Sequence, residues 1–260
     1  MARPTQRART LSQNFLADRA TAERVARLAA PDTRHPPLLL EVGAGQGALT
    51  EPLARRSREL RAYEIDPGLL PGLRARFAHT PHVRVVAGDF LAARPPRTPF
   101  AVAGNVPFSR TAAIVDWCLT APGLTDATLI TQLEYARKRT GDYGRWTLLT
   151  VRTWPCHEWR LVGRVGRYRF RPAPRVDAGI LRLERRPTPL LTGAAARRSW
   201  DDLVELGFSG VGGSLHASLR RARPGRRVDA AFRAARLDPR VLVGEVPPAA
   251  WLRLHEELTA

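Results

Sequence analysis

The sequence predicts a doubly wound α/β domain that is followed by a small all-helical domain. Three observations carry this prediction. Short apolar runs alternate with helically spaced segments over most of the chain, polar residues stand at the ends of the apolar runs, and no strand-like pattern follows Pro189. A chain of 260 residues is long enough for a large domain and a smaller one. We expect a basic arm over residues 1–17, the α/β domain over 18–186 and the helical domain over 190–260.

The alternation also gives the order of the elements. Apolar runs predict parallel strands over residues 38–42, 60–64, 83–87, 100–104 and 127–132. Helical spacing lies between them and before them, over residues 17–30, 48–53, 68–77, 111–119 and 134–140. Antiparallel strands are expected to close the sheet over residues 154–162 and 176–184, and the C-terminal helices to cover residues 200–208, 228–235 and 248–258.

A glycine-rich loop follows the first of these strands. In residues 43–47 glycine stands at every second position, which lets the backbone pass close to a ligand, and the helix that follows offers free N–H groups. Glu64 closes the next strand, where a carboxylate can bind the hydroxyls of a ribose. Asp66 has a structural interpretation, because Pro67 behind it suggests an N-cap and the first residue of a helix.

The next two strand ends carry Asp89 and the tetrapeptide Asn105-Val106-Pro107-Phe108. The carboxyl ends of parallel strands share one edge, where ligands bind. An exocyclic amine on a base is a poor nucleophile because its lone pair is delocalised into the ring, so an enzyme must hold it with hydrogen-bond acceptors. Asn105 Oδ1 and the Val106 carbonyl can accept, Pro107 fixes the chain, and Phe108 offers a flat face to a flipped-out base. These residues indicate methylation of an exocyclic amine.

The glycine spacing bears on the cofactor. The loop has the pattern Gly-x-Gly-x-Gly rather than the G-x-G-x-x-G of nicotinamide enzymes, and no His, Lys or Tyr constellation for hydride chemistry follows. Asp89 can accept a hydrogen bond from the adenine amine of a cofactor. The combination favours S-adenosylmethionine over a dinucleotide.

The charge of the chain predicts an anionic partner. It carries 42 basic and 24 acidic residues, a formal net charge of +18, and almost all of the basic residues are arginine. Nucleic acid is the leading candidate, because guanidinium groups match phosphates and stack on bases; a membrane surface is the alternative, which no strongly amphipathic helix supports. The residues expected to contact RNA are Arg3, Arg7, Arg9, Arg137, Lys138, Arg139, Arg220, Arg221, Arg223, Arg226 and Arg227.

Other features limit the class of protein. No apolar run approaches the roughly 20 residues needed to span a bilayer, and no hydrophobic signal segment follows Met1, so we expect a cytoplasmic protein. Cys118 and Cys156 lie in apolar stretches without ligand spacing, and the six histidines are scattered. We therefore expect buried thiols, no metal site and, by default, a monomer.

Several segments together resemble the rRNA adenine N6-methyltransferases. They comprise residues 12–16, 41–50, 64–66, 88–90, 104–108 and 170–177. The resemblance spans both domains and implies a Rossmann-like, S-adenosylmethionine-dependent methyltransferase fold. Residues 131–144 and the arginine-rich tail are more similar to actinobacterial Erm proteins, which methylate 23S rRNA and confer macrolide resistance, than to the small-subunit (16S) dimethylases. The resemblance implies Erm-type mono- or dimethylation of one adenine in large-subunit rRNA before full ribosome assembly. The alternative is a small-subunit (16S) rRNA adenine dimethyltransferase that acts in ribosome maturation.

The resemblance also implies roles for single residues. Phe108 stands where the family often has tyrosine and Ala178 where serine is common, so any hydroxyl contribution is lost there. Phe108 and Phe170 would sandwich the target base, while Asn105 and the Val106 carbonyl would orient its amine. The residues expected to hold the cofactor are Gln13, Asn14 and Leu16 at its methionine end, Gly43 and Gly45 along it, Glu64 at the ribose, Ile65 and Asp89 at the adenine, and also Phe90 and Asn105.

Two remoter functions stay open on the sequence alone. A nicotinamide-dependent oxidoreductase would share the glycine loop and the acid that follows it. A non-catalytic RNA-binding assembly factor would share the fold and the basic charge. Binding of S-adenosylhomocysteine but not NADH argues against the oxidoreductase, and methyl transfer to rRNA argues against the assembly factor.

Overall fold

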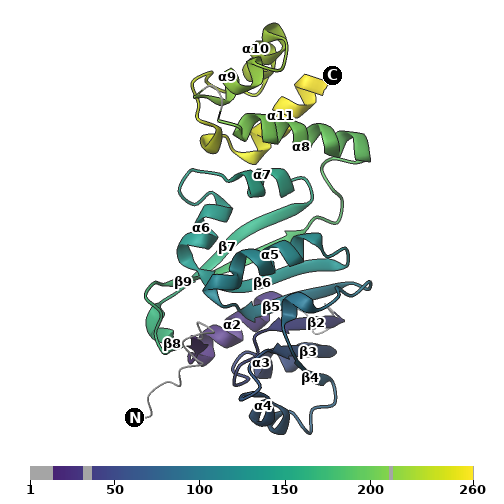
Figure 1. Ribbon diagram of the computed structural model, residues 1–260, viewed down its shortest axis with the longest axis vertical. Coiled ribbons are helices and arrows are strands. Elements are labelled where there is room, and N and C mark those ends of the chain that lie inside the picture. The colour runs from purple at the N-terminus through teal and green to yellow at the C-terminus, as the bar shows by residue number, and fades with distance from the viewer. Residues whose placement is uncertain (1–13, 32–36, 211–212, 260) are drawn as a thin grey trace. The chain divides into compact units, whose positions relative to one another are not determined.

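The computed structural model describes residues 14–31, 37–210 and 213–259. The chain divides into two compact units. Unit 1 comprises the described residues up to Ala136 together with Arg160–Arg185, and unit 2 comprises Arg137–Trp159 and the described residues from Arg186 onward. Figure 1 shows the elements of both units in chain order.

A seven-stranded sheet forms the centre of unit 1. Its strand order is β4-β3-β2-β5-β6-β9-β7, in which neighbours from β4 to β6 are parallel and β9 is antiparallel to β6. The strands are β2 (Leu38–Val42), β3 (Glu59–Glu64), β4 (Val83–Ala87), β5 (Phe100–Asn105), β6 (Leu124–Gln132), β7 (His157–Val165) and β9 (Ala178–Arg185). The doubly wound fold with a closing antiparallel strand is therefore confirmed.

The register of the strands aligns the predicted functional positions. Val42 is paired with Tyr63 and with Gly104, and Glu64 is paired with Ala87. The residues that follow these pairs leave the sheet at one edge. The strand order reverses beside β2, where β3 lies on one side and β5 on the other, and this is the position at which parallel α/β sheets bind ligands.

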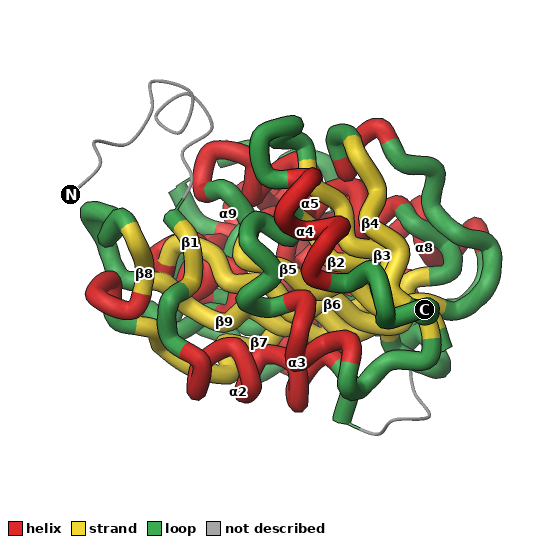
Figure 2. Tube along the Cα trace, turned by 90° about the horizontal axis from the view of Figure 1, so that it is seen from below, coloured by secondary structure: helices red, strands yellow, loops and turns green. Residues whose placement is uncertain are grey.

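Helices cover both faces of the sheet. Figure 2 shows α2 and α3 on one face and α5 on the other. The helices along this part of the chain are α2 (Arg19–Ala29), α3 (Thr50–Ala54), α4 (Leu70–Arg76), α5 (Thr111–Thr120) and α6 (Leu133–Thr140). Before α2, the short strand β1 (Phe15–Leu16) pairs antiparallel with β8 (Phe170–Arg171). Asp18 caps α2 by accepting from the Thr21 N–H at 2.9 Å.

The predicted start of the helix after β3 is wrong. The helix expected over residues 68–77 begins later, at Leu70, and Asp66 does not cap it. The Asp66 carboxylate instead accepts from the Gly68 N–H at 2.9 Å, which stabilises a turn before the helix. Proline and glycine at adjacent positions favour this turn over an early helical start.

Unit 2 is helical and has its own core. It contains α7 (Leu148–Thr153), α8 (Ala194–Phe208), α9 (Leu215–Arg220), α10 (Gly225–Ala234) and α11 (Pro248–Thr259). Trp200, Phe232 and Trp251 are fully buried in its core, and the rings of Phe208 and Trp251 stack at 5.6 Å. In the described parts of the chain, no helix is long and apolar enough to cross a membrane.

Residues 137–159 belong to unit 2, although the expected division at residues 186–190 places them in the α/β domain. The side chain of Val151, on α7, is buried in the core of unit 2. The Trp200 indole donates to the Arg152 carbonyl at 2.9 Å, and Arg152 forms an ion pair with Glu205 at 2.6 Å. The apolar residues of α7 therefore contribute to the helical core.

Candidate active site

The carboxyl ends of the parallel strands border a cavity of about 230 Å³ in unit 1. It lies at the edge of the sheet that the strand-end residues predict. Eleven of the predicted site residues line it: Asn14, Gly43, Gly45, Glu64, Ile65, Asp89, Phe90, Asn105, Val106, Pro107 and Phe108.

The glycine loop after β2 adopts backbone angles that favour glycine. Gly43, Gly45 and Gly47 have φ values of +69°, +58° and +85°. A Cβ atom on Gly45 would lie 3.1 Å from the Phe15 ring, so this position is also close to the strand β1. The loop therefore turns tightly along the cavity without side chains that would fill it.

The Glu64 carboxylate is fixed by backbone N–H groups. Its Oε2 accepts from the Gly45 N–H at 2.6 Å, and its Oε1 accepts from the Asp66 N–H at 2.7 Å. The side chain is buried at the wall of the cavity. Each carboxylate oxygen has a further lone pair, so Glu64 can still accept from a ligand hydroxyl.

A second buried acid lies in the strand before the glycine loop. Glu41 is 1% exposed, and its burial raises its pKa to about 8; the nearby Thr50 hydroxyl opposes this shift and the negative charge of Glu64 adds to it. Glu41 is therefore mostly protonated at neutral pH. The sequence analysis gave this residue no role of its own.

Asp89 is held at the start of the short helix η1 (Phe90–Ala92). Its Oδ1 accepts from the Leu91 N–H at 2.9 Å, and its Oδ2 pairs with Arg110 Nη2 at 2.8 Å. Arg110 also lines the cavity and is a site residue that the sequence analysis missed. Ile65 is 49% exposed, whereas the Phe90 ring is buried and packs on Trp117 at 4.4 Å.

The backbone around Asn105 is fixed on several sides. A Cβ atom on Gly104 would lie 2.7 Å from the Val42 carbonyl, so glycine lets β5 approach β2 closely there. The Asn105 Nδ2 donates to the Asn14 carbonyl at 2.7 Å, which leaves Oδ1 as the acceptor of this amide. The Val106 N–H donates to the Ile130 carbonyl at 3.2 Å.

Comparisons with known proteins agree with this geometry. Residues 5–260 match the family described as ribosomal RNA adenine dimethylase. The chain belongs to this family. It is 66% identical over 252 residues to an rRNA adenine N-6-methyltransferase of Streptomyces fradiae, over 96% of this chain and 78% of that protein. The crystal structure of the 23S rRNA methyltransferase ErmE matches with a TM-score of 0.90 at 51% identity, covering 95% of this chain and 100% of that chain.

A further relative is named for antibiotic resistance. The mycinamicin-resistance protein MyrB of Micromonospora griseorubida is 39% identical over 94% of this chain and 77% of that protein. The chain described here is, like these relatives, an rRNA adenine methyltransferase. Its α/β unit has the Rossmann-like methyltransferase fold. Among the described residues, no group of three His, Cys, Asp or Glu side chains is arranged to hold a metal ion.

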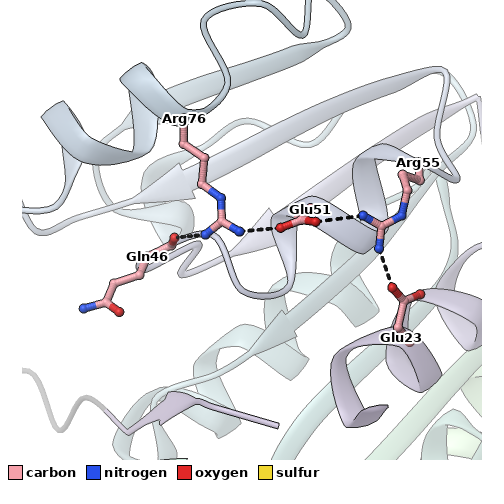
Figure 3. Close-up of polar contacts among 5 residues, drawn as sticks. All are labelled: Glu23, Gln46, Glu51, Arg55 and Arg76. Carbon is pink, nitrogen blue, oxygen red and sulfur yellow. Dashed lines mark hydrogen bonds and ion pairs between the residues drawn. The ribbon is translucent and has the colours of Figure 1, made fainter. Parts of the chain in front are cut away.

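A chain of ion pairs holds the glycine loop from outside the cavity (Figure 3). Arg76 on α4 donates to the Gln46 carbonyl at 2.8 Å and also pairs with Glu51. Glu51 in turn pairs with Arg55 at 3.0 Å, and Arg55 pairs with Glu23 on α2. These contacts join elements that are distant in sequence, so the strand and helix patterns gave no signal of them.

Two predicted contact residues do not face the cavity. Phe170 is fully buried in the hydrophobic core of unit 1, so neither face of its ring is open to a base, and the predicted sandwich with Phe108 is wrong for this structure. Pairing of β8 with β1 directs this side chain inward. Leu16 is also buried in that core and lines a separate cavity of about 220 Å³. Phe108 packs against the same core but also lines the site.

The predicted basic contacts have different surroundings. Gln13, Arg3, Arg7 and Arg9 lie outside the described residues. Arg137 pairs with Asp142, and its guanidinium lies 3.8 Å from the centre of the Tyr143 ring. The other basic residues that were predicted to contact RNA also belong to unit 2. They lie on α6, or from the end of α9 to the start of α10: Lys138, Arg139, Arg220, Arg221, Arg223, Arg226 and Arg227.

Proposed function

We propose that this enzyme transfers methyl groups from S-adenosylmethionine to N6 of one adenine in 23S rRNA and thereby confers resistance to macrolide-type antibiotics. The observation that carries the proposal is the convergence of Glu64, Asp89 and Asn105, each from a different strand end, on one cavity. The similarity to a 23S rRNA methyltransferase and to a mycinamicin-resistance protein supports the choice of substrate.

The donors and acceptors of the cavity fit an adenosyl cofactor. Glu64 can accept from both ribose hydroxyls, Asp89 from the adenine amine, and the exposed Ile65 side chain can pack on the adenine ring. A dinucleotide fits less well, because the loop N–H of Gly45 that would bind its pyrophosphate already donates to Glu64. When bound, S-adenosylmethionine supplies an electrophilic methyl group on a positively charged sulfur.

Asn105 and Val106 would act on the adenine amine. Asn105 Oδ1 and the Val106 carbonyl accept its N–H groups, which turns the nitrogen lone pair toward the methyl carbon. The bound donor would supply the methyl carbon and retain the S–C electron pair, and the methylated nitrogen would lose a proton to water. Among the described residues that line the cavity there is no His or Lys, so alignment and placed acceptors, rather than a strong side-chain base, provide the rate.

Phe108 would hold the extruded adenine. Its side chain lines the cavity directly after Pro107, and its remaining surface packs on the core of unit 1, which fixes the ring. We propose naked or partly assembled large-subunit rRNA as the substrate and a monomer as the active form. The formal net charge of +18 favours binding to such an exposed phosphate backbone.

Mapping the modified nucleotide tests the proposal. We expect cells that express the wild-type chain to carry N6-methyladenine at one additional position in 23S rRNA and to tolerate higher macrolide concentrations. Cells that express Asn105→Ala at the same level provide the control and should show neither change. Additional methylation of 16S rRNA instead of 23S rRNA, or rRNA binding without methylation, would contradict the proposed function.

A further inference from the structure

An exposed aromatic side chain lies on the segment between β7 and β8. Tyr168, in the short helix η3 (Arg167–Arg169), is 68% exposed, more than any other large hydrophobic side chain among the described residues. Single exposed apolar residues are common on protein surfaces. The surroundings of this ring, however, give it a defined position and a charged neighbourhood.

The ring lies against the backbone of Gly166. A Cβ atom on Gly166 would lie 2.3 Å from Tyr168 Cε1 and 2.9 Å from its Cζ. Gly166 itself has φ −63° and ψ 140°, which any residue adopts, so the backbone does not require glycine there. The absence of a side chain instead leaves room for the tyrosine ring.

Several arginines lie close to Tyr168 in the sequence, and one of them lies near its ring. The Arg169 guanidinium lies 5.6 Å from its centre and pairs with Asp18, and Arg171 Nη1 donates to the Tyr168 carbonyl at 3.0 Å. Arg167, directly before the tyrosine, and Arg175, between β8 and β9, are both exposed. The ring is therefore an exposed flat surface on a stretch of chain that carries Arg167, Arg169, Arg171 and Arg175.

The ring and these arginines lie within residues 166–177, which contact elements beside the active site at two places. Arg171 is paired with Phe15, which lines the cavity, and Figure 2 shows β1 and β8 side by side. At the second place the Asp177 carbonyl accepts from the Leu133 N–H at 3.0 Å, directly after β6, which is the neighbour of the strand that ends in Asn105. None of residues 166–177 lines the cavity itself, but the bonds of Arg171 and Asp177 to elements next to the cavity hold this stretch in place near it.

We propose that Tyr168 stacks on an unpaired nucleotide next to the target adenine, while Arg167, Arg171 and Arg175 contact the phosphates around it. This inference rests on the proposed rRNA substrate and adds a nucleotide-binding position to it. Unpaired bases in RNA loops are commonly held on aromatic rings, and the neighbouring arginines supply the charge that the backbone requires. An acidic protein partner would use the arginines but would not need a flat ring.

The first test separates stacking from apolar bulk. Steady-state methylation of in-vitro-transcribed 23S rRNA, together with filter binding of that transcript, is measured for Tyr168→Ala, Tyr168→Leu and Tyr168→Phe. We expect Ala and Leu to raise the Kd and KM for RNA about 5- to 50-fold and Phe to stay within about twofold of the wild type. The KM for S-adenosylmethionine and kcat should change little, because the cofactor site is intact. Equal behaviour of Leu and Phe would overturn the proposal.

The second test uses the space at Gly166. Gly166→Ala should displace the ring and weaken RNA binding in the wild-type background, but should add nothing in the Tyr168→Ala background. An equal loss in both backgrounds would show that Gly166 acts without the ring and would contradict the proposal. The binding measurement does not require turnover. A wild-type protein that binds the transcript without methylating it would refute the proposed function. The binding of the Tyr168 variants would still decide whether this ring stacks on RNA.

Discussion

The Asn105 amide is oriented before any substrate arrives, because its Nδ2 donates to the Asn14 carbonyl at 2.7 Å. Removing this amide removes an acceptor for the adenine amine but leaves Glu64 and Asp89, the predicted adenosine contacts, in place. We therefore expect Asn105→Ala to lower kcat on rRNA about 10²- to 10³-fold. Single-turnover methyl transfer from radiolabelled S-adenosylmethionine measures this effect.

Cofactor affinity is the control for that substitution. Calorimetric titration with S-adenosylhomocysteine should give a Kd within a few fold of the wild-type value. If Asn105→Ala retains methyl transfer, or loses cofactor and activity together, Asn105 does not act as the amine acceptor.

Glu41 links the stability of the fold to pH. Its pKa rises from 4.5 in the unfolded chain to about 8 in the folded protein, because burial disfavours its charged form. Between these values the folded protein keeps a proton that the unfolded chain has lost. This group therefore lowers the free energy of unfolding as the pH rises, by up to about 1.4 kcal/mol per pH unit.

Glu41→Gln replaces the titrating carboxyl group with an amide of similar volume that does not titrate. We expect the thermal unfolding midpoint of the variant, relative to that of the wild type, to increase steadily from about pH 5 to about pH 8. Differential scanning calorimetry at several pH values measures both midpoints, and the other titrating groups cancel in the difference. A midpoint difference that is constant over this range would show that Glu41 is not buried with a raised pKa.

Residue types at strand ends were predictable because their position in the chain sets their position in a parallel sheet. Glu64, Asp89 and Asn105 all follow apolar runs, and all line the cavity. Phe170 was not predictable in this way. Its direction depends on the pairing of two-residue strands, β1 with β8, which have no periodicity long enough to show which face is buried.

At the scale of elements, the ion pairs from α2 to α4 hold the glycine loop. The Gln46 carbonyl is fixed by Arg76, and a Cβ atom on Gly47 would lie 3.0 Å from Phe77, directly after α4. We expect Arg76→Ala to loosen the loop and to raise the Kd for S-adenosylhomocysteine about 3- to 10-fold, in keeping with the removal of one charged hydrogen bond and of an exposed ion pair. Calorimetric titration measures this change.

Arg74→Ala is the matched control, because Arg74 is exposed on the same helix and carries the same charge. It should leave the Kd for S-adenosylhomocysteine within about twofold of the wild-type value. Equal effects of the two substitutions would mean that net charge, rather than the hydrogen bond to Gln46, influences the cofactor.

Strands that form clear apolar runs were predicted well, whereas two short helices were not. The apolar runs of β2 to β5 carried enough signal, whereas α7 and α9, of six residues each, were missed. A helix of that length is marginal alone and is stabilised by its tertiary contacts. For α7 these are the contacts of Val151 and Arg152 in the core of unit 2, which no local pattern contains.

At the scale of the whole molecule, the excess of positive charge should govern RNA affinity. Basic residues lie on both units, and the formal net charge is +18. Binding to phosphates releases condensed counterions, so affinity falls as salt rises. We expect the Kd for 23S rRNA transcript to rise at least about 10²-fold between 50 and 200 mM salt, as measured by filter binding.

Substitutions in the first turn of α10 test where that charge acts. Arg226→Ala combined with Arg227→Ala should flatten the slope of log Kd against log salt by about one unit for each phosphate that the variant no longer neutralises. The Kd for S-adenosylhomocysteine should not change, because these exposed residues belong to unit 2 and the cavity belongs to unit 1. An unchanged salt slope in the double variant would mean that other arginines bind the phosphates. A slope near zero in the wild type would mean that charge does not drive RNA binding at all.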